Sequence, residues 1–299
     1  MDARSLLVGI LVPGVLCGAL LYAFLALGSS RPRHVWTAAS GLAIAIAYAA
    51  GQVGVVGWNG WFPVQSRDWL VPLVPALGLW CAFESSLPFS AGQRWFARAV
   101  WALGLGWLCV RPLLLQADRA SDGGGDWLSQ ERLSAWGEAA LVGVAGISLW
   151  QIWARIGAYL PVRNTCSSAC AVVFAAAGAQ MLSHSASGSD LHRALFAALV
   201  ACLVAAWWRP ERNFGEGLAG VLALLHIALC YEGARWAALP LASALLLCFA
   251  PAFLLLALVV VPETMPGPTR VLARVGALLI PLGIAVFVAW SNAAPATGY

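Results

Sequence analysis

The sequence predicts an all-α, polytopic integral membrane protein with about ten transmembrane helices. Hydrophobic residues make up 61% of the 299-residue chain and charged residues only 10%, whereas soluble domains carry about 25% charged residues. Apolar runs of about 20 residues recur from end to end, long enough to cross a hydrocarbon core about 30 Å thick. Because lipid offers the backbone no hydrogen-bond partners, such runs must be helical.

The expected spans follow one another with short connections, at residues 5–27, 36–57, 69–86, 95–115, 136–160, 165–184, 191–208, 214–233, 237–261 and 269–290. The longest connection, 116–135, is too short for a soluble domain, so we expect residues 1–299 to form a single transmembrane domain. The first span has a charged start at Arg4, as a signal peptide would. It is longer than the usual signal core of about 7–15 residues, and we expect it to be retained, with cleavage as the alternative.

The distribution of arginine predicts the orientation of the chain. Short cytoplasmic loops are enriched in basic residues, and all 17 basic residues here are arginine. The segments after the odd-numbered spans hold ten of them, at Arg31, Arg33, Arg94, Arg98, Arg155, Arg163, Arg209, Arg212, Arg270 and Arg274. We therefore expect those segments in the cytoplasm and both termini on the non-cytoplasmic side of a bacterial-type cell membrane.

Three sequence echoes suggest an internal repeat. The stretch "RPRHVWTAASGLA" from Arg31 resembles "RPERNFGEGLA" from Arg209. In the same order, "PLVPALGLWC" matches "PLASALLLC", and "RWFARAVWAL" matches "RVLARVGAL". The echoes predict that spans 1–4 and 7–10 (units 5–115 and 191–290) are parallel copies, joined by connecting helices in 136–184. The alternative is chance, because Leu and Ala matches are frequent in such a composition.

Polar residues inside spans are the candidate functional residues, because burying them in lipid is costly. The deepest is His226, and its simplest role is a hydrogen bond between helices. Next come the amides of Gln52, Gln151 and Gln180, which commonly join helices. Arg111 and Glu138 lie nearer span ends, border the same outer connection, and are expected to pair across spans 4 and 5.

No motif predicts a catalytic residue, a cofactor or a metal. The outer segment "SHSASGSDLH" contains His184, Asp190 and His192, but two histidines without a fourth ligand are usually part of an ordinary loop, so we expect no metal there. Cys166 and Cys170 are one helical turn apart without nearby histidines, and the eight cysteines are expected to be small packing residues.

The sequence leaves three functions open. Ten spans, proline breaks and the expected repeat favour a permease for a small molecule or an ion. Few deep charges and many packing residues suit a non-catalytic membrane scaffold or assembly subunit equally well. A membrane enzyme acting on lipid-linked substrates ranks third, because no acid, base or nucleophile set is evident. The expected partner is the lipid bilayer; protein partners and homo-oligomers stay open, and no basic stripe points to nucleic acid.

Overall fold

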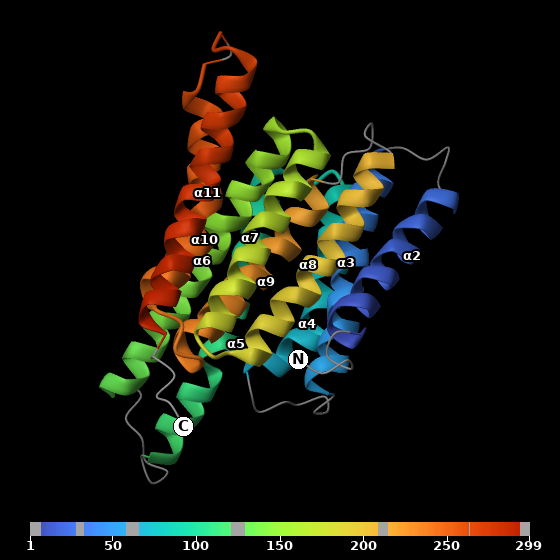
Figure 1. The fold of residues 1–299 in the computed structure, drawn as a ribbon. Coiled ribbons are helices and arrows are strands. Elements are labelled where there is room, and N and C mark those ends of the chain that lie inside the picture. The colour runs from blue at the N-terminus through green and yellow to red at the C-terminus, as the bar shows by residue number, and fades with distance from the viewer. Residues whose placement is uncertain are drawn as a thin grey trace.

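In the computed structural model, the described residues are 7–27, 33–57, 66–120, 129–208, 215–262 and 264–293. Over these residues the chain is all-helical, without strands, and contains ten helices long and apolar enough to cross a membrane. The predicted all-α, polytopic membrane class is therefore supported by the length and composition of the helices. The helices run up and down beside one another in a bundle (Figure 1).

The ten long helices are α2 (Val12–Leu27), α3 (Arg33–Val56), α4 (Leu70–Ser86), α5 (Ala91–Ala120), α6 (Gln130–Tyr159), α7 (Val162–Leu182), α8 (Ala186–Trp208), α9 (Gly215–Trp236), α10 (Leu241–Val260) and α11 (Gly267–Asn292). A π-helical turn, η1 (Leu7–Leu11), leads into α2, and a 3-10 turn, η2 (Ser66–Trp69), leads into α4. Each helix overlaps one predicted span. In Figure 1, α2 begins and α11 ends at the lower side of the bundle, as an even number of crossings requires.

Helix α8 begins earlier than the sequence suggests. The segment expected to be an outer loop is reduced to a turn at residues 183–185, and α8 starts at Ala186. Polar side chains at the start of α8 are satisfied inside the protein: Ser189 Oγ donates to the Ala177 carbonyl oxygen, and Asp190 pairs with Arg193 at 2.9 Å. The earlier start places His192 inside the bundle, fully buried, and not in a loop.

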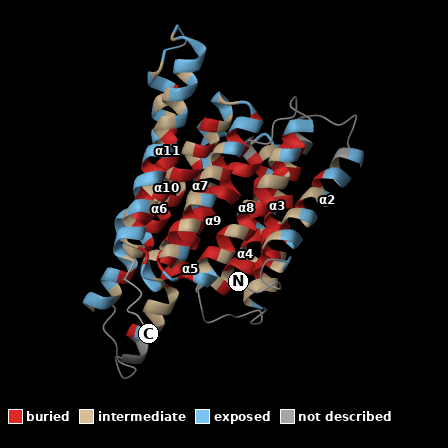
Figure 2. Ribbon diagram, in the orientation of Figure 1, coloured by how far each residue is buried: buried red, intermediate tan, exposed pale blue. Residues whose placement is uncertain are grey.

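Helix α9 is the centre of the bundle. Residues 217–230 are all buried, and the helix packs against α3, α4 and α6 (Figure 2). Glycines allow the close approach of α3: a Cβ at Gly217 would overlap the Thr37 carbonyl oxygen, and one at Gly41 would overlap the Gly217 carbonyl oxygen. Small residues commonly permit such contacts between membrane helices. The centre of the fold is thus a helix that contacts protein on nearly all sides.

The expected repeat stays a prediction. Helix α11 packs along α10, whereas α5 packs along α6, and α4 along α3. The helices that the repeat would make equivalent therefore have different principal neighbours. The segments with Arg31–Pro32 and Arg209–Pro210, which carry the first echo, lie outside the described residues.

Candidate functional site

His226 lies in the middle of the central helix. Its side chain is fully buried, and its Nε2 atom is 3.1 Å from the carbonyl oxygen of Leu247 on α10. The ring thus faces a neighbouring helix. Its other nitrogen, Nδ1, is buried and has no hydrogen-bond partner among the described residues.

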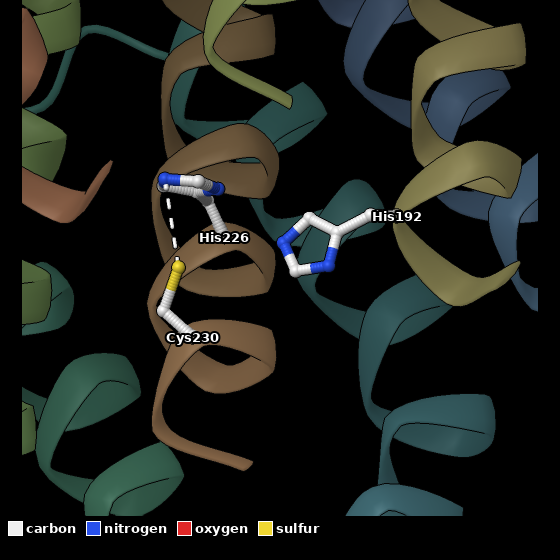
Figure 3. Close-up of side chains that lie close together, drawn as sticks. All are labelled: His192, His226 and Cys230. Carbon is white, nitrogen blue, oxygen red and sulfur yellow. Dashed lines mark hydrogen bonds between the residues drawn. The ribbon is translucent and has the colours of Figure 1, made fainter. Parts of the chain in front are cut away.

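His192 of α8 faces His226 across the helix interface. The ring centroids are 5.7 Å apart and the ring planes are at 84° to each other. His192 Nδ1 contacts two acceptors, the side-chain oxygen of Gln180 and the carbonyl oxygen of Gly188, each at 3.2 Å. Its Nε2 atom is buried without a hydrogen-bond partner in the described part of the chain. Figure 3 shows a nitrogen of His192 directed toward the His226 ring.

The hydrogen bonds of the two histidines define which nitrogen carries the proton. Gln180 Nε2 donates to the Leu229 carbonyl oxygen at 2.7 Å, so the amide oxygen is the group that faces His192. Because carbonyl and amide oxygens only accept, His192 Nδ1 and His226 Nε2 must each donate an N–H. A neutral imidazole has one N–H and one lone pair. The lone pairs therefore lie on the two unpartnered atoms, His192 Nε2 and His226 Nδ1.

Two glycines make room for the amide that orients His192. A Cβ at Gly188 of α8 would overlap Gln180 Oε1 and come within 2.7 Å of Ser185 Oγ. A Cβ at Gly233 of α9 would come within 2.5 Å of Gln180 Nε2. The Gln180 amide therefore fits between α8 and α9 only because both helices have a glycine at the position facing it. Residues of α7, α8 and α9 together fix the orientation of the His192 ring.

Cys230 adds a thiol to the histidine pair. It lies one turn after His226 on α9, and its Sγ atom is 3.8 Å from His226 Nε2. One ligand atom from each of His192, His226 and Cys230 lies within 4.8 Å of the other two, and all three residues are buried. We call these three residues the histidine–cysteine cluster (Figure 3). Of the expected site residues, His226 and Gln180 are brought together here.

The other two amides lie apart from the histidine–cysteine cluster. Gln52 of α3 donates through Nε2 to the Arg67 carbonyl oxygen at 2.5 Å, which ties α3 to η2. Gln151 of α6 is half-buried, and its Nε2 atom has no partner among the described residues. The four deep polar residues thus divide into a pair at one site and two separate positions.

Glu138 finds its partners on α9. Its carboxylate accepts a hydrogen bond from Tyr231 at 2.7 Å and lies 3.6 Å from the guanidinium of Arg235. The guanidinium of Arg111 lies over the Trp69 ring, 5.1 Å from its centroid. The expected pairing of Arg111 with Glu138 stays a prediction.

A buried ion pair joins α4 to α5. Glu84 accepts hydrogen bonds from Nε and Nη2 of Arg98, and both side chains are largely buried. The guanidinium also lies 5.3 Å from the centroid of the Trp150 ring on α6. Arg98 lies in the second turn of α5, which begins at Ala91, and its expected cytoplasmic location stays a prediction. The two opposite charges thus meet within the bundle and neutralise each other.

A separate groove of about 330 Å³ lies between α7, α10 and α11. Its walls are mainly apolar, as at Leu254 of α10. Asn164 of α7 and Arg274 of α11 add polar groups to the lining. None of its lining residues belongs to the histidine–cysteine cluster. The cluster remains the candidate site, because there unpartnered buried groups from two helices converge.

The sequence predicts only part of this site. The sequence places His192 with His184 and Asp190, its neighbours in the chain, and predicts that Cys230 is a packing residue. The available signal was the spacing of His226 and Cys230, four residues apart on one helix face. In comparisons with known proteins, no family model, no curated protein and no solved structure matches this chain.

Proposed function

We propose that the protein is a permease for a small cation, and that the cation is held in transit by His192 and His226. The observation that supports this is a pair of facing imidazole lone pairs in the middle of the bundle, neither of which has a partner among the described residues. A buried polar group without a partner costs free energy, and membrane proteins retain such groups mainly at functional sites. A proton or a metal cation placed between the two nitrogens would satisfy both.

Polar groups connect the cluster to one end of the bundle. Ser185, in the turn between α7 and α8, and Ser189, one turn into α8, are both buried. Gln180 follows and contacts His192. These hydroxyl and amide groups offer a small cation successive oxygen atoms between the turn and the imidazoles. By the arginine distribution this end is the non-cytoplasmic one, and we propose that both termini also lie there, in a bacterial-type cell membrane.

Flux through proteoliposomes tests the proposal. We expect the purified protein to carry protons or monovalent metal cations into vesicles when a potassium diffusion potential is imposed. His192→Leu and His226→Leu should each lower the initial rate at least tenfold while the protein elutes as a folded species. The matched control is His184→Gln, which changes the exposed histidine of the turn and should leave the rate unchanged.

A scaffold is the second candidate, and a specific pattern of hydrogen bonds favours it. Gln52, Gln180 and Ser243 each donate to a backbone carbonyl oxygen of another helical element. Such bonds hold helices together without handling a ligand. If wild-type protein carries no cation under any imposed gradient, the permease proposal fails and the scaffold is preferred.

A further inference from the structure

We infer that the histidine–cysteine cluster binds a soft metal ion, monovalent copper, through His192, His226 and Cys230. Binding rests on the geometry of these three residues alone. That the same ion is the permease substrate rests, in addition, on the proposed function. Thiolate ligands select soft ions such as Cu(I), and imidazole also suits copper.

The surroundings of both imidazoles resemble those of metal-binding histidines. A ligating histidine usually donates its other N–H to a carbonyl or carboxylate oxygen, which fixes its tautomer and turns the lone pair toward the metal. His192 does so with Gln180 and Gly188, and His226 with Leu247. The remaining nitrogen of each ring is buried and has no hydrogen-bond partner in the part of the chain that the structure describes. The cluster thus has ligand atoms together with the groups that orient them.

The spacing of the cluster suits a single ion. Metal–nitrogen and metal–sulfur bonds of about 2.0–2.3 Å place the ligand atoms of a trigonal site about 3.5–4 Å apart. One ligand atom from each residue already lies within 4.8 Å of the other two. Cys230 Sγ contacts His226 Nε2 at 3.8 Å, so an ion held by the lone pairs of both rings requires the Cys230 side chain to turn toward the Nδ1 side of the His226 ring.

Charge balance selects a monovalent ion. When Cys230 is ionised, the three ligands carry one negative charge in total, because the imidazoles are neutral. Cu(I) makes the site neutral, whereas Zn(II) leaves one uncompensated positive charge among fully buried residues. Uncompensated charge in a membrane interior is energetically costly. In the binding step the Cys230 S–H bond breaks, a Cu–S bond forms, and one proton is released for each Cu(I) bound.

Further buried thiols lie on α8 and on the helices beside α8 and α9. Cys248 of α10 is a further buried thiol and lies near Cys230. The Sγ atoms of Cys17 on α2 and Cys202 on α8 are 3.8 Å apart. Cys202 follows His192 by ten residues, a rise of about 15 Å along α8. Buried sulfur atoms at two levels of the bundle fit a soft cation better than a hard one such as sodium.

The test is Cu(I) binding by the full-length purified protein, measured anaerobically by competition with a chromophoric Cu(I) chelator. We expect one Cu(I) per chain that Zn(II) does not displace in tenfold excess, with one proton released into weakly buffered solution. His192→Gln, His226→Gln and Cys230→Ser should each weaken binding at least tenfold. The control Cys109→Ser, which changes a buried thiol outside the cluster, should bind like wild type.

X-ray absorption at the copper edge keeps the inference falsifiable if a variant does not fold. We expect two nitrogen neighbours and one sulfur neighbour around copper in the wild-type protein. A copper shell of sulfur atoms alone would overturn the inference. So would a Cys17→Ser protein that no longer binds Cu(I) together with a His226→Gln protein that binds it like wild type. Binding without cation flux would retain the copper site and refute the permease. Proton flux without Cu(I) binding would support the permease and refute the copper site.

Discussion

The imidazole rings of His192 and His226 meet edge to face, with centroids 5.7 Å apart, in a bundle where both side chains are fully buried. Each ring donates its N–H outward to oxygen acceptors and directs its lone pair inward. The two helices that carry the rings thus share an acceptor site between them.

We expect His226→Leu to fold but to lose on the order of 1 kcal/mol of unfolding free energy, the typical size of a hydrogen bond between membrane helices. The lost interaction is the bond to the Leu247 carbonyl oxygen. Thermal or denaturant unfolding in detergent would measure the change. His184→Gln, in the exposed turn, should stay within about 0.5 kcal/mol of wild type. A His226→Leu protein as stable as wild type would show that the bond to α10 contributes nothing.

Gly188→Ala should disturb the Gln180 amide, because the new methyl group would overlap Gln180 Oε1. We expect a loss on the order of 1 kcal/mol, since the amide must give up its bonds to His192 and Leu229. The matched control is Gly178→Ala on α7, where a Cβ would meet no atom within 4 Å. There the better helix propensity of alanine should stabilise the protein by up to about 1 kcal/mol. Equal unfolding temperatures for the two variants would contradict this packing argument.

Helix positions could be predicted from the sequence, because apolar runs long enough to cross a membrane have only one way to satisfy their backbone. The site could be predicted only in part. His226 was found by its depth in an apolar run, which a single sequence reports directly. Its relation to His192 depends on α8 beginning at Ala186, and near that start Ser189 Oγ donates to the Ala177 carbonyl oxygen of α7. Such contacts between distant segments are not visible in the hydropathy of either one.

The Glu84–Arg98 pair illustrates the same limit. Each residue lies near the end of a predicted span, where a charge can reach the membrane interface. Only the packing of α4 and α5 shows that the two charges meet inside the bundle. The sequence contained both residues but not their contact.

Both termini are expected on the non-cytoplasmic side, because the segments after the odd-numbered spans hold ten of the 17 arginines. An exported-enzyme reporter fused after Tyr299 should therefore be active, and a reporter that requires the cytoplasm should be inactive. A second pair of fusions after Arg163, at the start of α7, should give the opposite result. The reverse pattern at both positions would invert the orientation without changing the fold.

Glu84→Leu should destabilise the protein by about 3 kcal/mol or more, because it leaves the Arg98 guanidinium buried without its counter-charge. The double variant Glu84→Leu with Arg98→Leu should recover most of that loss, since an apolar pair can replace a buried ion pair at little cost. Unfolding free energies of wild type, both single variants and the double variant complete a thermodynamic cycle. Additive losses in the cycle would mean that the two charges do not stabilise each other. A large coupling energy, with cation flux retained in the double variant, would show that this pair supports helix packing and takes no part in transport.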